Sequence, residues 1–382
     1  MNRFPVKQFL TWVAPLAIWG AGNAIAHPDP TMFAESAFVT APQIVDCTLE
    51  TGEQVQCYEI FVSYQPQDLT IGPFCPPSLA ETGGLWDWDG DNAGLYRLDR
   101  EFFEMVAGLG YKFYDDDEAL TIVDVRVDRP PEDSNACLSA SVDESVLITM
   151  RLPVEPIMAD KPTELGTVAK VGVALDGVPI FADAPSVLDR GHLPALDVCG
   201  GHIDPGGWYH WHATATDIET MLEAEGVVAD CLLAQEPSAL FGYAFDGFPI
   251  YGSLEADGST PTDLDECGGH VSSIGTDKIY HYHAAVTFPN LPPCLVGVMA
   301  KSNFSTTAAQ GIGAANARNE SGGDAGPPDF EKAAASLGIT AKELKDAIDN
   351  NGGREANLSV VAEQLGVDET ALRNVFSKPA GK

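Results

Sequence analysis

The stretch "GGWYHWHA", residues 206–213, returns in altered form as "KIYHYHAA", residues 278–285. Of the eight histidines in this chain of 382 residues, these two His-x-His pairs contain four. The alternation of aromatic residue and histidine is typical of a β-strand, because successive side chains of a strand point to opposite faces. We therefore expect each stretch to be a strand that presents both imidazoles on one face and both aromatic rings on the other.

The two stretches belong to two copies of a longer repeat. Asp-Gly pairs between short β-favouring runs predict a tight hairpin turn in each copy. A Cys-Leu pair closes each copy. We expect an internal duplication, with copies at about 172–231 and 242–294. The matching blocks are "GVALDGVPIF" (172–181) and "GYAFDGFPIYG" (242–252), "LDVCGGH" (196–202) and "LDECGGH" (264–270), and "WYHWHA" (208–213) and "IYHYHA" (279–284).

Composition divides the rest of the chain. Residues 27–300 mix short apolar runs with turn residues and hold one helical pattern, at 100–110, which predicts a mostly β (α+β) main domain. Residues 301–328 are rich in small and polar residues, as in a flexible linker. Residues 329–378 contain a second, smaller repeat with helix-ending glycines and a capping box of Thr340 and Glu343. We expect there a small all-α domain with two repeats, suited to packing or to protein docking.

The N-terminus and the charge limit location and partners. Residues 1–26 have the basic start, apolar core and small-residue end of a signal peptide. No later apolar run approaches the roughly 18 residues that a membrane-spanning helix needs. With 21 basic and 56 acidic residues, the net charge of −35 disfavours nucleic acid and anionic membranes as partners. We expect a periplasmic or secreted protein without a membrane span.

Eight cysteines in an exported chain predict disulfides, each stabilising by about 2–4 kcal/mol. The chain has no Cys-x-x-Cys, so a thioredoxin-like role or a zinc ribbon has little support. Each repeat copy has one cysteine in Cys-Gly-Gly-His and one before the closing leucine, which we expect to pair. The remaining four would pair within the N-terminal half, although thiolate metal ligands are an alternative. The expected pairs are Cys199–Cys231, Cys267–Cys294, Cys47–Cys57 and Cys75–Cys137.

The histidines form the strongest candidate site. Each copy combines its His-x-His pair with the histidine of Cys-Gly-Gly-His, and three such imidazoles suit zinc, copper or iron. Copper or zinc is the expected ion. The alternatives are histidines that hydrogen-bond within a polar core, and acid–base groups that need no metal. The two candidate sets are His202, His210 and His212, and His270, His281 and His283.

Four weaker candidates remain. Asp176 and Asp246 of the Asp-Gly turns are explained by turn formation alone, and the alternative is that they bind the imidazoles. The spacing of the aspartates in "DWDGDNAG" is that with which a calcium loop begins, but the later glycine and glutamate are missing, so a solvated acidic turn is expected ahead of calcium. The aspartates of "DWDGDNAG" are Asp87, Asp89 and Asp91.

The last candidate is His27. Cleavage after residue 26 would make His27 the first residue, whose amine and imidazole can chelate copper.

The blocks "CGGHIDPGGWYHWHA", "CGGHVSSIGTDKIYHYHA" and "FDGFPIYG" resemble the YHYH-domain family, which is named for that tetrapeptide. The resemblance is specific across 172–296, and "IGPFCP" (71–76) and "DWDGDNAGLYRLD" (87–99) extend it upstream. Trp211 departs from the family name, but it keeps the aromatic face. The resemblance implies a shared fold and export, and it transfers no catalytic residue.

Three functions follow as expectations. The first is an exported metal-binding protein that holds copper or zinc at the two histidine sets. The second is a metal-dependent enzyme, hydrolytic or oxidative, in which the same histidines leave a coordination position open. The third is a structural or adhesive secreted protein in which the motif packs a core.

Overall fold

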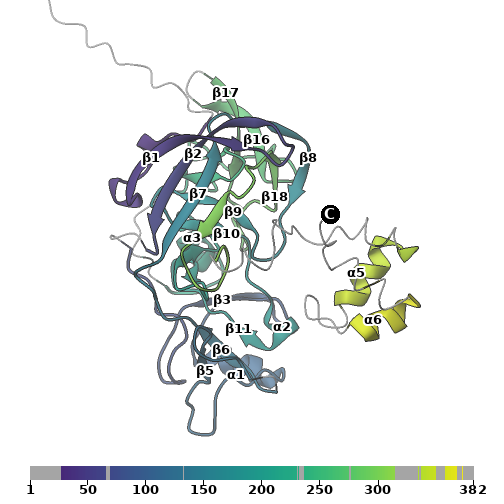
Figure 1. Cartoon of the computed structure of the whole chain (residues 1–382). Coiled ribbons are helices and arrows are strands. Elements are labelled where there is room, and N and C mark those ends of the chain that lie inside the picture. The colour runs from purple at the N-terminus through teal and green to yellow at the C-terminus, as the bar shows by residue number, and fades with distance from the viewer. Residues whose placement is uncertain are drawn as a thin grey trace, which may run out of the picture.

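The computed structural model describes residues 27–314, with gaps at 66–68, 132, 230, 232–235 and 275–276. Of the C-terminal part it describes residues 334, 337–349, 358–367 and 372. The predicted signal peptide at 1–26 lies outside the described residues and stays a prediction. The fold is mostly β with few helices, as expected (Figure 1).

The centre of the fold is an eight-stranded sheet with the order β12-β13-β10-β9-β14-β15-β17-β16. Counted outward from the β9–β14 pair, matching segments of the two sequence copies take the same places. Ile180 pairs with Trp211 in parallel, and Ile250 pairs with Tyr282 in the same way. The duplication itself stays a prediction. The bounds are β12 Gly201–Ile203, β13 Tyr209–Trp211, β10 Pro179–Phe181, β9 Lys170–Ala174, β14 Leu240–Ala244, β15 Pro249–Tyr251, β17 Asp277–His283 and β16 Gly269–Ile274.

The Asp-Gly pairs form the hairpin turns that the sequence predicts. Gly177 and Gly247 have φ of +86° and +92°, a region that favours glycine. The aspartate before each glycine accepts a backbone hydrogen bond across the turn, from Val178 N to Asp176 at 2.9 Å in the first copy. These turns join β9 to β10 and β14 to β15 as antiparallel pairs.

A four-stranded sheet, β1-β2-β7-β19, shares its core with the eight-stranded sheet. Ile60 and Met150 of this sheet are buried in one cluster with Val173 and Ile180 of the larger sheet. Strand β8, which follows β7 of the four-stranded sheet, pairs with β18 at the end of the second repeat copy. The bounds are β1 Thr40–Thr48, β2 Gln54–Ser63, β7 Leu147–Pro153, β19 Phe304–Thr306, β8 Met158–Glu164 and β18 Cys294–Gly297.

Strand β19 corrects the predicted linker. Residues 301–314 belong to the main fold, because Phe304 pairs with Met150 of β7 and is itself buried. Ala308 and Ala314 are also buried. Residues 301–314 are rich in small residues because the segment is tightly packed. A flexible linker has a similar composition, which explains why the prediction was wrong here. The remainder of the predicted linker, 315–328, lies outside the described residues.

A second apolar cluster packs around the helix that the sequence predicts at 100–110. This helix is α1, Arg100–Gly108, and the Asp99 side chain caps it by accepting from Phe102 N at 3.1 Å. Trp88 and Phe103 are buried in the cluster. The neighbouring elements are the hairpin β3 Leu85–Trp88 and β4 Gly94–Arg97, the sheet of β11 His192–Leu193, β6 Ala136–Ser139 and β5 Ile122–Asp124, and the helix α2 Val187–Arg190. Helix α3 Ile218–Ala224 belongs to the main cluster instead, and the 3-10 turns Pro30–Met32 and Glu35–Ala37 flank Phe33, which packs against that cluster.

Four disulfides join all eight cysteines, and they are the four pairs predicted from the sequence. Cys199–Cys231 and Cys267–Cys294 each close one repeat copy, with separations of 32 and 27 residues. The other two, Cys47–Cys57 and Cys75–Cys137, lie in the N-terminal half. No cysteine is left as a thiolate ligand.

The described part of the C-terminus contains two helices, α5 (Ala341–Asp349) and α6 (Leu358–Leu365). The predicted capping box is present: Glu343 N donates to Thr340 Oγ1 at 3.2 Å, and Thr340 N donates to the Glu343 carboxylate at 2.9 Å. Leu344 and Val361 are buried between the helices. Since much of 329–378 lies outside the described residues, a complete all-α domain and its docking role stay predictions. Among the described helices, none is long and apolar enough to cross a membrane.

Candidate metal centres

Strand pairing brings the histidines of each copy together. In the first copy β12 runs antiparallel to β13, and His202 lies directly opposite His210. In the second copy β16 and β17 place His270 opposite His281 in the same way. The third histidine of each set follows two residues further along the strand, on the same face. Alternation along a strand therefore converts a sequence pattern into a cluster of three imidazoles.

The glycines of Cys-Gly-Gly-His allow this close approach. Gly200 has a φ of +85°, which favours glycine. Gly201 lies under the Tyr209 ring, where an added Cβ would come within 2.2 Å of the tyrosine hydroxyl. Gly269 lies under Tyr280 in the same manner, at 2.1 Å. The Gly-Gly pair thus makes the turn and leaves room for the first tyrosine of the motif.

The first set consists of His202, His210 and His212. His212 Nε2 lies 2.9 Å from His210 Nε2 and 3.0 Å from His202 Nε2. His212 Nδ1 donates to the carbonyl of Ala182 at 2.7 Å, and His202 Nδ1 donates to that of Pro194 at 3.2 Å. His210 and His212 are fully buried.

The second set has the same arrangement and one further residue that could bind a metal. His281 Nε2 lies 3.1 Å from both His270 Nε2 and His283 Nε2. The Nδ1 of His283 donates to the carbonyl of Gly252 at 2.8 Å. The Glu255 carboxylate completes the set, with one oxygen 3.3 Å from His270 Nε2 and the other 3.9 Å from His283 Nε2.

Burial favours the neutral form of the first set and of His281 and His283. It lowers the pKa of His202 and of His281 to about 4, and like-charge repulsion from His283 and His270 adds to the effect at His281. Burial also holds the pKa of His210 and His212 well below the ordinary value, with repulsion between the imidazoles as the next cause. The neutral imidazole is the form that coordinates a metal.

Comparison with known proteins identifies part of the chain. Residues 149–263 match the family described as YHYH protein. The chain carries a YHYH domain. The match begins in β7 and ends before the second Cys-Gly-Gly-His, so it is shifted upstream of the resemblance at 172–296 and contains only the first histidine set. Neither the curated proteins nor the solved structures give a match to this chain.

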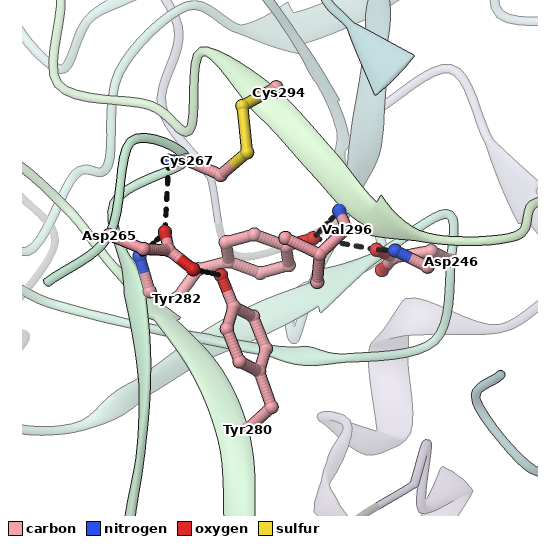
Figure 2. Close-up of a disulfide and its surroundings, with 9 residues drawn as sticks. Asp246, Asp265, Cys267, Tyr280, Tyr282, Cys294 and Val296 are labelled. Atoms are coloured by element: carbon pink, nitrogen blue, oxygen red, sulfur yellow. Dashed lines mark hydrogen bonds between the residues drawn. A yellow bond between two sulfur atoms is a disulfide. The ribbon is translucent and has the colours of Figure 1, made fainter. Parts of the chain in front are cut away.

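The aromatic residues of the YHYH motif anchor the strands from the opposite face. In the second copy Tyr280 donates to Asp265 at 3.0 Å, and Tyr282 donates to Asp246 at 2.6 Å (Figure 2). Asp265 also accepts from the backbone N–H of Cys267 at 2.9 Å, so the tyrosine and the disulfide turn are tied together. The first copy repeats one contact, from Tyr209 to Asp197 at 2.9 Å.

The Tyr282 contact assigns Asp246 of the second Asp-Gly turn to the aromatic residues of the YHYH motif. Among the described residues, Asp176 and Asp246 bind no imidazole. Burial raises the pKa of Asp176 to about 6, and the backbone N–H of Val178 opposes that shift. Trp211 takes the position of Tyr282 in the first copy, but its indole N–H and Asp176 Oδ2 are both buried without a hydrogen-bond partner among the described residues.

The sequence reasoning missed two acidic residues of the second set. Glu255 follows the second hairpin, and the exposed Asp263 accepts from His270 Nδ1 at 2.7 Å. Both lie in the loop between the hairpin and Cys-Gly-Gly-His, where the two copies differ most. The shift of 70 residues that matches Ala182 with Gly252 places Pro185 at the position of Glu255. Matching the copies therefore concealed a ligand that only one copy has, although an acidic residue close before Cys-Gly-Gly-His was a usable signal.

The other candidate residues lie apart from the two histidine sets. Asp87, Asp89 and Asp91 lie in and after β3, where Asp89 accepts from Ser186 Oγ at 2.9 Å. They are not among the groups of converging metal-ligating atoms in the described residues. The imidazole of His27 contacts the carbonyl of its neighbour, at 3.2 Å.

Proposed function

We propose that the protein binds two transition-metal ions, copper or zinc, one at each histidine set. The supporting observation is that, within each set, the Nε2 atoms of different histidines face each other at close range. His202 and His212 both use their Nδ1 hydrogens on backbone carbonyls. In a neutral imidazole the other nitrogen then carries a lone pair and no hydrogen. Two lone pairs 3.0 Å apart repel each other unless a cation lies between them.

The second set supports the same proposal independently. His283 Nδ1 donates to Gly252, and His281 Nδ1 donates to the Ile279 carbonyl at 3.3 Å, so their facing Nε2 atoms also lack hydrogens. A metal 2.0–2.1 Å from each nitrogen would hold the nitrogens roughly 2.9–3.4 Å apart, depending on the coordination angle. The separations of 2.9–3.1 Å lie in that range.

The ligand chemistry restricts the ion. Imidazole nitrogen with at most one carboxylate suits zinc and copper, whereas magnesium and calcium prefer oxygen ligands. Carbonyl acceptors on Nδ1 fix the ring orientation and increase the basicity of the coordinating nitrogen. We further propose that the protein works in the periplasm or outside the cell, since its four disulfides are suited to an oxidising compartment.

The proposal is tested by counting metal in untagged protein. We expect two zinc or copper ions per wild-type chain at neutral pH, by mass spectrometry under native conditions and by calorimetry. His281→Ala and His283→Ala should each leave one tightly bound ion, with affinity at the altered set lowered by orders of magnitude. His192→Ala is the matched control, because His192 contacts the carbonyl of Pro131 and belongs to neither set.

Non-reducing peptide mapping should show the same four disulfides in every variant. Wild-type protein that binds neither zinc nor copper would overturn the proposal and favour a packing role for the motif. A metal-dependent enzyme remains the second candidate, favoured by one observation: the first set has three protein ligands and the second has four.

A further inference from the structure

We infer that the two centres differ in kind, and that only the first keeps a coordination position for a small exogenous ligand. The inference rests on the proposed metal binding. The second centre is a closed four-ligand site, and the first is an open three-ligand site beside a small apolar cavity.

Closure of the second centre follows from the position of Glu255. Its two carboxylate oxygens lie against two different imidazoles of the set, those of His270 and His283. Three imidazoles and a carboxylate give four protein ligands, the number that fills a tetrahedral zinc site. Asp263 orients the His270 ring at 2.7 Å, a contact typical of a rigidly held ligand.

The first centre lacks the corresponding ligand. Among the described residues, no fourth metal-ligating side chain joins the three histidines of the first centre. Pro185, which has no ligating side chain, takes the position of Glu255 in the repeat. Aromatic rings border His210 on one side, with the centroids of Phe181 and Trp208 at 5.0 and 5.1 Å. Three protein nitrogens and a free position are the pattern of a metal site that exchanges ligands.

A cavity of about 90 Å³ borders the first centre through one residue, His202. Its lining also contains Pro194, whose carbonyl accepts from His202 Nδ1, but neither His210 nor His212. The cavity therefore lies against the His202 ring on the side away from the converging Nε2 atoms, and it does not define the open position. We assign to the open position a small anionic or neutral ligand that has one donor atom, because buried aromatic rings border the centre.

Cobalt and azide provide the test. Metal-free protein is loaded with Co²⁺, whose visible absorption reports coordination, and is titrated with azide. Wild-type protein should bind two cobalt ions, of which one responds to azide. Glu255→Ala should raise the number of responding ions from one to two per chain. Glu266→Ala is the matched control, because Glu266 is exposed beside the second set, and it should leave the number at one.

A second pair of variants keeps the test independent of Glu255. His202→Ala should abolish the azide response, whereas His270→Ala should keep it. Two responding ions in wild-type protein, or none, would overturn the inference and leave the proposed metal binding intact. Failure of the wild-type protein to bind cobalt, zinc or copper would instead overturn the proposed function.

Discussion

The hydroxyl of Tyr282 donates a 2.6 Å hydrogen bond to Asp246, joining strand β17 to the hairpin turn that follows β14. The same hydroxyl accepts from the backbone N–H of Val296 at 2.7 Å, and Asp246 accepts from that of Gly297 at 2.8 Å. Strand β17, the hairpin turn and strand β18 therefore meet where the Tyr282 hydroxyl contacts the Asp246 carboxylate. The histidines point to the other face of β17, so the stabilising contacts and the proposed metal ligands lie on opposite faces of one strand.

Tyr282→Phe should lower the free energy of unfolding by about 1–3 kcal/mol, because it removes the acceptor of the Val296 N–H and one of the hydrogen bonds to the buried Asp246 carboxylate. Urea denaturation measures this loss. The metal stoichiometry should stay at the wild-type value. Tyr111→Phe is the control, since the Tyr111 ring packs on Trp88 and no hydrogen bond of its hydroxyl is found among the described residues. A loss of bound metal in Tyr282→Phe would contradict the separation of roles.

Asp263→Asn should weaken zinc binding at the second centre by about 10–100-fold, because the amide is a poorer acceptor for the His270 Nδ1 hydrogen. Competition with a chromogenic chelator measures the affinity. The first centre should be unaffected. Asp257→Asn is the control, because Asp257 is exposed and its carboxylate contacts Ser259 of the same loop and no other residue in the described part of the chain. Equal effects of the two substitutions would show that general loop charge, and not this contact, matters.

Asp217→Asn should destabilise the protein by about 2–4 kcal/mol. The buried Asp217 carboxylate accepts from Thr214 and Thr216 hydroxyls at 2.9 and 2.8 Å, and from the hydroxyl and backbone N–H of Ser253. An amide nitrogen would face some of these donors. Asp116→Asn, at an exposed ion pair, should change stability by less than about 0.5 kcal/mol.

The Asp217 network also links the two centres. Thr214 lies two residues after His212, and Ser253 follows Gly252, whose carbonyl orients His283. We therefore expect Asp217→Asn to lower zinc affinity at the second centre as well, in the same chelator assay. An unchanged affinity in a destabilised variant would show that the carboxylate supports the fold alone.

Asp87→Asn should stabilise the protein at pH 8 and have little effect near pH 4. Burial raises the pKa of Asp87 to about 6, and Asp183, Asp89 and Glu225 add to the shift by repulsion. A raised carboxyl pKa contributes stability that is complete below the unfolded value and is lost as the pH rises through about 6. Urea denaturation at the two pH values tests the sign. A calcium-dependent stabilisation of wild-type protein that Asp87→Asn abolishes would instead support the calcium alternative.

Deletion of residues 329–382 should leave the main fold and both metal centres intact. Among the described residues, the buried cluster around the histidines includes none beyond 314, whereas the described tail helices have a cluster of their own. Limited proteolysis of the full chain should cut between 315 and 328. A sharp fall in melting temperature on deletion would show that the tail belongs to the main core.

Local patterns were enough to predict much of the fold and of the site. Alternation in "YHWH" and "YHYH" fixes which side chains share a face, so the histidine sets could be predicted without knowledge of the strand order. The positions of Glu255 and Asp263 could not be predicted in this way, because their loop has no matching block in the first copy. The one usable signal, an acidic residue close before Cys-Gly-Gly-His, does not say where a side chain points. The place of residues 301–314 was also hidden, since pairing between Phe304 and Met150 depends on a contact 154 positions distant in sequence.

Under the proposed metal binding, the disulfides next to Cys-Gly-Gly-His would also determine when the ion can enter. Cys199 and Cys267 each lie three residues before a histidine of their set, and a reduced thiolate binds zinc and copper(I) more tightly than imidazole does. A chain that met metal before oxidation would be trapped with the ion on sulfur. Disulfide formation removes all eight competing thiolates. For a protein that binds metal as proposed, oxidative folding would protect against mismetallation, and sulfur would be oxidised before the metal arrives.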